Sequence, residues 1–256
     1  MSSPSGASPP SLEDLRIKIF ADGANIDDLK RAAQNPLIAG FTTNPTLMRK
    51  AGVVDYVSFA RNALDIVGDR PISFEVFADE PAAMEEQALE IASWGSSVYV
   101  KIPVTTCDGA TCAPLIGRLA ASGVQINVTG VMTLEQVEAA TAALAPDVAG
   151  VVSVFAGRIA DTGRDPVPQM IEARSIVAVR PRAELLWASS REVLNIFQAD
   201  QAGCHIITLT QDLLDKALNV GISLERFSQE TVEMFFRDAA AAGFDIPIRR
   251  PMTSTG

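Results

Sequence analysis

The stretch VYVKIPV, residues 98–104, places Lys101 inside an apolar, β-branched run that is typical of a buried strand. Burying an ammonium group without a partner is costly, so a lysine at this position needs a physical reason. One reason is chemical: a desolvated lysine has a lowered pKa, and its neutral amine can form a Schiff base with a carbonyl substrate. The alternative is a structural lysine that pairs with a carboxylate or reaches water at the end of the strand.

Short apolar runs alternate with helical segments along the rest of the chain. The expected strands, including the lysine stretch, cover residues 17–21, 37–41, 72–77, 98–102, 124–128, 150–155, 183–187 and 204–208. Strict alternation of strand and helix implies right-handed crossovers and a parallel sheet. Eight such units predict the α/β class and a closed (β/α)8 TIM barrel, and residues 223–242 predict an additional C-terminal helix. The lack of a Gly-x-Gly-x-x-Gly motif after the first run disfavours a dinucleotide-binding fold.

Composition sets the boundaries of the predicted barrel. No linker rich in glycine or serine interrupts residues 17–245, which predicts a single barrel domain with its C-terminal helix over residues 15–246. Residues 1–14 begin with a run rich in serine and proline that lacks the apolar core of a secretory signal, and we expect a disordered leader there. Residues 247–256 are expected to form a flexible tail.

Charge, hydropathy and cysteine content argue against several classes of function. The 256 residues carry a formal net charge of −10 without a cluster of Lys and Arg, so we expect no nucleic-acid partner. No run of about 18 apolar residues is present, so we expect no membrane partner. The cysteines Cys107, Cys112 and Cys204 and the single histidine, His205, match neither a disulfide framework nor a standard zinc spacing. We therefore predict a cytoplasmic protein with no metal and no cofactor, in which His205 is a hydrogen-bonded structural residue.

Polar residues gather where the predicted strands end, which is the face of such a barrel that carries chemistry. In chain order they are Asp22, Asn44, Glu75, Lys101, Asn127, Thr129, Ser153, Arg158, Ser189, Ser190 and Arg191. Taken singly, Asn44, Ser189 and Ser190 are more simply explained as helix caps. Asp22 and Glu75 are harder to dismiss, although a structural ion-pair network around the lysine is the competing interpretation.

The collected residue types fit one reaction. A Schiff base on Lys101 would withdraw electrons from a former ketone carbon and permit cleavage of the carbon–carbon bond one atom further along. That cleavage also needs a carboxylate base, a second acid–base group with a water molecule, and groups that bind hydroxyls. All of these residue types are present, so catalysis is the favoured interpretation.

Several motifs, in this order along the chain, resemble the transaldolase family, whose short members include the fructose-6-phosphate aldolases. They are FADGAN at 20–25, GFTTNPTL at 40–47, VKIPVT at 100–105, INVT at 126–129 and VSVFAGRI at 152–159. The resemblance runs from about residue 17 to residue 245. It implies an enzyme of the pentose phosphate pathway type that moves a dihydroxyacetone unit from a ketose phosphate, such as fructose 6-phosphate or sedoheptulose 7-phosphate, to an aldose phosphate. The implied partners are small sugar phosphates, and the expected assembly is a homo-oligomer.

The resemblance also implies roles for single residues. Lys101 matches the Schiff-base lysine, Asp22 matches the acid–base residue at the cleaved bond, and Glu75 and Thr129 match the pair that holds a catalytic water. The implied substrate-binding residues are Asn44, Asn127 and Ser153 for the dihydroxyacetone part, Arg158, Ser189 and Arg191 for the phosphate, and Thr43 and Phe155 to complete the set.

Two positions distinguish the subfamilies. Transaldolases carry Glu on the third strand and Phe in the sixth-strand motif, where the aldolases carry Gln and Tyr, so Glu75 and Phe155 favour transfer over simple cleavage. Gly23, Trp187 and the loop 106–112 depart from the usual pattern, which keeps open a specialised-pathway transaldolase with an unusual acceptor. A class I aldolase that releases free dihydroxyacetone also stays open, as does, outside the enzymes, a degenerate barrel that binds sugar phosphates.

Overall fold

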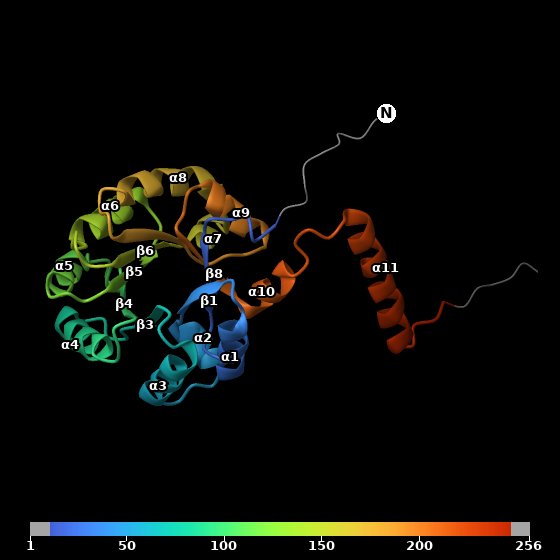
Figure 1. The fold of residues 1–256 in the computed structure, drawn as a ribbon, viewed down its shortest axis with the longest axis horizontal. Helices are drawn as coiled ribbons and strands as arrows, with labels where there is room; N and C mark the ends of the chain where they lie inside the picture. The colour runs from blue at the N-terminus through green and yellow to red at the C-terminus, as the bar shows by residue number, and fades with distance from the viewer. Residues whose placement is uncertain (1–10, 247–256) are drawn as a thin grey trace, which may run out of the picture. The chain divides into compact units, whose positions relative to one another are not determined.

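The computed structural model describes residues 11–246 and contains a closed barrel of eight parallel strands. The strands are β1 Lys18–Asp22, β2 Ile38–Thr42, β3 Ile72–Glu75, β4 Val98–Pro103, β5 Ile126–Val131, β6 Gly150–Val154, β7 Ala183–Trp187 and β8 Ile206–Thr210. Each strand pairs with the next one along the chain, and β8 closes the barrel against β1 (Figure 1). The predicted (β/α)8 TIM barrel is confirmed.

Helices follow the strands and surround the barrel (Figure 1). They are α1 Ile26–Gln34, α2 Pro45–Lys50, α3 Tyr56–Val67, α4 Pro81–Ala92, α5 Ala113–Ala121, α6 Leu134–Ala143, α7 Ala156–Ala160, α8 Pro166–Val177, α9 Leu194–Gln201 and α10 Gln211–Ala217. Local sequence explains where several begin. The Asn44 side chain, for example, accepts a hydrogen bond from the N–H of Leu47, and Pro45 occupies the first turn of α2, where its missing N–H costs nothing.

Side chains that point into the barrel form a small apolar cluster. It comprises Phe20, Val151, Leu186, Ala188 and Ile206, with Ala39, Tyr99 and Phe155 packed against it. The Phe20 ring fits only because residue 40 is glycine: a Cβ there would clash with the ring at a distance of 2.5 Å. Side chains on the opposite face of the strands, such as Phe74 and Trp187, are fully buried. The apolar side chains fill the middle of the barrel, and the polar side chains lie at the carboxyl ends of the strands.

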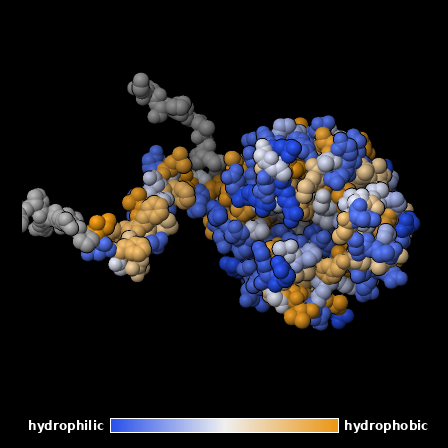
Figure 2. All heavy atoms as spheres, turned by 180° about the vertical axis from the view of Figure 1, so that it is seen from behind, coloured by the Kyte–Doolittle hydropathy of each residue, from blue (hydrophilic) through white to orange (hydrophobic). Residues whose placement is uncertain are grey.

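A helix in a separate compact unit follows the barrel. The barrel unit covers residues 13–218, whereas the described residues 219–246 belong to the second unit, which contains α11 Leu224–Ala241. No residue of α11 is buried, and several of its apolar side chains, among them Phe227, Phe235 and Phe236, are exposed. Figure 2 shows hydrophobic surface along this helix. The additional C-terminal helix is therefore confirmed.

The domain boundaries stay predictions. Most of the expected leader, residues 1–10, and the whole expected tail, residues 247–256, lie outside the described residues. Within the described part of the chain, no helix combines the length and the hydropathy that crossing a bilayer demands.

Candidate active site

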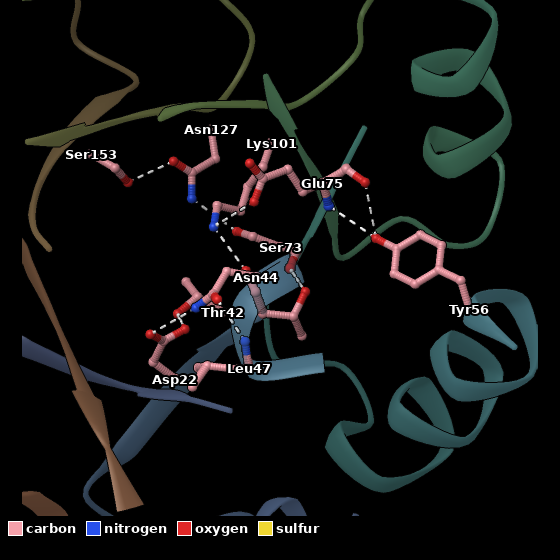
Figure 3. Close-up of polar contacts among 11 residues, drawn as sticks. Asp22, Thr42, Asn44, Leu47, Tyr56, Ser73, Glu75, Lys101, Asn127 and Ser153 are labelled. Atoms are coloured by element: carbon pink, nitrogen blue, oxygen red, sulfur yellow. Dashed lines mark hydrogen bonds and ion pairs between the residues drawn. The ribbon is translucent and has the colours of Figure 1, made fainter. Parts of the chain in front are cut away.

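Lys101 lies in the barrel on β4 and is only 6% exposed. Its Nζ donates a hydrogen bond to the carbonyl oxygen of Thr43 at 2.8 Å and lies 3.3 Å from Oε2 of Glu75 (Figure 3). The lysine is therefore buried, as predicted, and it has both a carbonyl acceptor and a carboxylate partner. A buried charge is tolerated only with such partners. The carboxylate is close enough to exchange a proton with the amine, and the carbonyl orients it.

Strand register brings the carboxylate to the lysine. Glu75 ends β3 and is paired in register with Lys101 on β4, so the two side chains leave the sheet on the same face. The Glu75 side chain is 17% exposed, which leaves its carboxylate reachable from the cavity. The sequence predicted these two residues at one barrel end, and the structure places them in contact.

Asp22 ends β1 on the other side of the same cavity (Figure 3). The Thr42 hydroxyl donates to its Oδ1 at 2.8 Å, and the Asn44 amide donates to its Oδ2 at 3.4 Å. Burial raises the pKa of the Asp22 carboxyl above its ordinary value, although the Lys101 charge and the two hydrogen bonds oppose this effect. A carboxyl with a raised pKa can both accept and return a proton near neutral pH, as acid–base catalysis requires.

A chain of buried hydrogen bonds joins side chains from three strands, β3, β5 and β6, near the lysine (Figure 3). The Ser153 hydroxyl donates to Oδ1 of Asn127 at 2.6 Å, and the Asn127 amide donates to the Ser73 hydroxyl at 3.0 Å. Ser73 was not singled out from the sequence, because a lone serine in an apolar strand gives no signal. The chain fixes the orientation of the Asn127 amide, since its oxygen and its nitrogen each have an assigned partner.

Unlike the polar groups described above, the hydroxyl of Thr129 has no hydrogen-bond partner in the described part of the chain. Its Oγ1 is buried. Thr129 is paired in register with Pro103 on β4 and lines the same cavity as Glu75 and Lys101. A buried hydroxyl without a partner costs free energy, so Thr129 is suited to binding a water or a substrate oxygen.

Arginines occupy the rim that follows β6 and β7. The Arg158 guanidinium lies 5.4 Å from the centroid of the Phe155 ring, and Arg191 forms an ion pair with Asp161. Asp161, at the end of α7, was not singled out from the sequence. Both arginines line the cavity, where their planar forks suit phosphate oxygens.

A close approach of helix α7 and the loop after β7 sets the spacing of this rim. A Cβ on Gly157 would lie 1.6 Å from the carbonyl oxygen of Ser189, so only glycine fits there. Ser189 itself has a φ of 65°, a left-handed conformation that costs a non-glycine residue of order 1 kcal/mol or more. The Ser190 hydroxyl donates to the carbonyl oxygen of Thr208 at 2.9 Å and ties the loop to β8.

One cavity of about 530 Å³ collects nearly all of the predicted residues. Those that line it are Asp22, Asn44, Glu75, Lys101, Asn127, Thr129, Ser153, Phe155, Arg158, Ser189 and Arg191. Thr43 differs: its side chain is fully buried, its hydroxyl donates to the carbonyl oxygen of Ser73, and its own carbonyl accepts from Lys101. The structure thus places Thr43 behind the cavity wall. Lys50 also lines the cavity, and nothing in the sequence around it indicated this position.

Other candidates for chemistry lie elsewhere or are not found. His205 Nδ1 accepts a hydrogen bond from the N–H of Leu185 at 2.8 Å, as expected of a structural histidine. The three cysteines are free thiols, and Cys107 alone is exposed. In residues 11–246 no three His, Cys, Asp or Glu side chains come together in a way that could hold a metal ion.

The fold and the cavity together define the class of protein: a (β/α)8 barrel with a polar cavity at the carboxyl ends of its strands, where barrel enzymes carry their active sites. The family model described as Transaldolase/Fructose-6-phosphate aldolase matches residues 19–247. The chain therefore belongs to the transaldolase/fructose-6-phosphate aldolase family. The resemblance noted from the motifs is confirmed, and the chain is an enzyme of the transaldolase class.

Three curated relatives, each named "Probable transaldolase", align with this chain over most of their own length. The chain is 36% identical over 202 residues to a "Probable transaldolase" of Dehalococcoides mccartyi, covering 77% of this chain and 88% of the relative. It is 32% identical over 221 residues to one of a Thermoanaerobacter species, covering 84% and 96%. With one of an Exiguobacterium species it shares 29% identity over 223 residues, covering 87% and 97%.

Proposed function

We propose that this enzyme transfers a dihydroxyacetone unit from a ketose phosphate, such as fructose 6-phosphate or sedoheptulose 7-phosphate, to an aldose phosphate through a Schiff base on Lys101. The observation that carries the proposal is the position of the lysine. It is buried on β4, 3.3 Å from the Glu75 carboxylate, in a cavity that also holds Asp22 and two arginines. A structural ion pair would need neither the acid on β1 nor the cationic rim.

The first step is imine formation. Glu75 takes a proton from the Lys101 ammonium group, and the neutral amine attacks the ketone carbon of the donor. The carbinolamine oxygen then leaves as water, with its second proton returned by the carboxyl of Glu75. Thr129, whose hydroxyl is buried without a protein partner in the described chain, supports the proposal because it can hold that water beside the lysine.

The second step breaks a carbon–carbon bond. Asp22 removes the proton from the hydroxyl on the carbon that becomes the aldehyde, and the bond to the neighbouring carbon breaks as electrons move into the imine. From fructose 6-phosphate this releases glyceraldehyde 3-phosphate and leaves a three-carbon enamine on Lys101. The enamine then attacks the acceptor aldehyde, Asp22 returns its proton to the new hydroxyl, and water hydrolyses the imine. With erythrose 4-phosphate as acceptor the product is sedoheptulose 7-phosphate.

Binding groups for the rest of the substrate surround the lysine. Asn44, Asn127 and Ser153 offer amide and hydroxyl groups to the hydroxyls of the dihydroxyacetone unit, with Phe155 beside them. At the rim, Arg158, Ser189 and Arg191 are proposed to hold the phosphate. Thr43 contributes through its carbonyl, which orients the lysine amine, rather than through its buried side chain.

Trapping tests the covalent step. Borohydride added with fructose 6-phosphate should fix a three-carbon adduct on Lys101, because reduction converts an imine into a stable amine. The matched control is Lys18, a strand lysine whose Nζ is paired with Glu184 and is far more exposed. Mass mapping of an adduct on Lys18, or of no adduct at all, would reject the mechanism and favour a barrel that only binds sugar phosphates.

Turnover measurements distinguish transfer from simple cleavage. A transaldolase consumes fructose 6-phosphate rapidly only when an acceptor aldehyde is present, whereas an aldolase releases free dihydroxyacetone without one. A panel of aldose phosphate acceptors, with fructose 6-phosphate as donor, decides between the housekeeping acceptor and that of a specialised pathway.

The assembly and the location of the enzyme are further parts of the proposal. A homo-oligomer is supported by the exposed apolar side chains of α11, such as Phe227, Phe235 and Phe236, which a second protein surface could cover. Light scattering should give a mass above that of one chain, and a chain ending at residue 222 should have a smaller assembly. The cytoplasmic location and the lack of a nucleic-acid partner stay predictions.

A further inference from the structure

The backbone of Glu75 lacks a strand partner on one side. On the β4 side the ladder continues, since Glu75 is in register with Lys101 and the N–H of Val76 donates to the Lys101 carbonyl at 3.1 Å. On the β2 side the pairing stops at Thr42 and Ser73, because the chain after Thr43 turns away into α2. The N–H and C=O of Glu75 therefore face a position that no strand of the described chain occupies, and buried backbone groups in that situation need another partner.

The hydroxyl of Tyr56, the first residue of α3, supplies that partner (Figure 3). The N–H of Glu75 donates to Tyr56 Oη at 3.0 Å, and the same hydroxyl donates to the carbonyl oxygen of Glu75 at 3.1 Å. A phenol can accept one hydrogen bond while donating another, so a single side chain stands in for a neighbouring strand. The backbone N–H and C=O of Glu75, the residue with the proposed catalytic carboxylate, are thereby both bonded to helix α3 of the outer layer.

Aromatic packing holds the Tyr56 ring in place. Its centroid lies 4.5 Å from that of Phe77, 5.7 Å from that of Trp94 and 6.2 Å from that of Phe74, and all three pairs are edge-on. Burial raises the pKa of the Tyr56 hydroxyl and outweighs the hydrogen bond with the Glu75 backbone, which lowers it, so the group stays protonated and remains a donor at neutral pH. A ring held on several sides keeps its hydroxyl at a fixed place in the barrel wall.

We infer that Tyr56 is a positioning residue, which fixes the backbone of Glu75 and through it the carboxylate 3.3 Å from Lys101. The expected effect on catalysis rests on the proposed function, whereas the contact between Tyr56 and the Glu75 backbone is independent of it. Tyr56 does not line the cavity and touches no reacting atom, so it acts only through Glu75. A misplacement of a catalytic group by about 1 Å is enough to cost up to 10²-fold in rate.

Tyr56→Phe tests this, with Tyr99→Phe as the matched control. Tyr99 is the other tyrosine of the chain; it lies on β4 and packs against the apolar cluster inside the barrel. Tyr56→Phe should lower kcat for transfer from fructose 6-phosphate to erythrose 4-phosphate by roughly 10- to 10²-fold and leave KM within about twofold. Tyr99→Phe should change kcat by less than about twofold.

A double substitution separates positioning from a general loss of structure. In a Glu75→Gln background, Tyr56→Phe should lower kcat by less than about twofold, because the group that Tyr56 positions has already lost its acid–base function. An equal loss in both backgrounds, or a loss no larger than that of Tyr99→Phe, overturns the inference. Should Tyr56→Phe fail to fold, Phe77→Leu, which loosens the same ring but keeps the hydroxyl, is compared in the same two backgrounds with the same criterion.

Amide hydrogen exchange gives a result that does not depend on the reaction. Tyr56→Phe should speed exchange at the Glu75 N–H by at least about tenfold, since that group loses its acceptor, and Tyr99→Phe should not. Unchanged exchange at Glu75 overturns the inference even when the enzyme is active. If wild-type enzyme forms no borohydride adduct while exchange at Glu75 responds as expected, the Schiff-base proposal fails and the positioning contact stands.

Discussion

The two sides of the active-site cavity hold their charged groups in different ways. On the β3–β4 side, the side chains of Lys101 and Glu75 are 8% and 17% exposed. The Thr43 carbonyl accepts a hydrogen bond from the lysine amine, and the Tyr56 hydroxyl holds the backbone of Glu75. On the β6–β7 side, the side chains of Arg191 and Asp161 are 49% and 54% exposed. A buried pair is shielded from salt and sensitive to small displacements, whereas an exposed pair is weak and easily exchanged for another anion. The difference suits chemistry on one side and reversible phosphate binding on the other.

The largest effect should come from the buried side. Glu75→Gln keeps the shape and a hydrogen bond but removes the proton acceptor, so we expect the transfer rate to fall by roughly 10²–10⁴-fold. Lys101 should still be trapped by borohydride, but more slowly than in wild type, because imine formation then lacks its acid–base group. The share of free dihydroxyacetone per turnover should rise, by analogy with the aldolase subfamily. Melting temperature, free dihydroxyacetone and transferred product are measured on one preparation.

The competing view of Glu75 gives a different outcome. If the carboxylate only neutralises Lys101, the Gln variant should lose stability through an unpaired buried charge, and both activities should fall together. A destabilised variant with an unchanged product ratio would show that Glu75 takes no part in the catalytic step. Both sides of the cavity would then hold ion pairs without a catalytic carboxylate, despite their different burial.

Asp22→Asn should separate function from stability on the same buried side. Transfer should fall by roughly 10²–10⁴-fold, because an amide cannot take the hydroxyl proton. The pKa of Asp22 is raised in the folded protein, so its ionisation opposes folding: wild type loses stability as pH rises from the unfolded value toward the folded one. The variant should therefore melt a few degrees above wild type at pH 8, by roughly 2–4 °C, with a smaller gain at pH 4.

The control for this pH effect is Asp147→Asn, at an exposed loop position of the barrel unit. It should change the melting temperature by similar small amounts at both pH values. A gain for Asp22→Asn that is larger at pH 4 than at pH 8 would contradict the raised pKa and hence the assigned acid–base role.

Arg191→Ala examines the exposed side. Loss of a charge-assisted bidentate contact of about 1.5–3 kcal/mol should raise KM for phosphorylated substrates by roughly 10- to 10²-fold and leave unphosphorylated substrates nearly unaffected. The wild-type KM should also rise with salt, which screens an exposed arginine, whereas borohydride trapping at Lys101 at saturating substrate should respond little. Equal losses on both substrate types would reject a phosphate role for Arg191.

The smallest effect is expected at the partner of that arginine. Asp161 forms an ion pair with Arg191, so Asp161→Asn should free the guanidinium and lower KM for phosphorylated substrates. Because exposed ion pairs contribute about 0.2–1 kcal/mol, the change should be no more than about fivefold. Steady-state kinetics on fructose 6-phosphate measures it, and an increase in KM would show that Asp161 orients Arg191 instead of competing with the phosphate.

Sequence periodicity was sufficient for the barrel and for which residues meet at its carboxyl end. Alternation fixes which strands are neighbours, and in-register neighbours such as Glu75 and Lys101 then share a face. The strand ends were less accurate: residues 72–77 were expected where β3 is Ile72–Glu75, and 204–208 where β8 is Ile206–Thr210. A strand ends where its ladder partners leave, which is a tertiary property that local composition does not contain.

The supporting residues of the site were harder to predict for the same reason. Thr42, Ser73 and Tyr56 bond to Asp22, Asn127 and Glu75 across strands or from a helix, at separations of 19 to 54 residues. Such contacts depend on strand tilt and register at the level of single ångströms. Serine, threonine and tyrosine are also ordinary residues in strands and helices, so their type alone carries no signal.

The close approach of Gly157 to Ser189 has a consequence for protein engineering. The missing side chain of Gly157 shapes the cavity rim. Any side chain at 157 would push helix α7 away from the loop after β7, and with them Arg158 from Arg191. A library randomised at 155 and 157 and selected for new acceptors should therefore return variety at 155 and glycine alone at 157. Altered acceptor choice is therefore expected from changes in the cavity wall and not from changes in the spacing of Arg158 and Arg191.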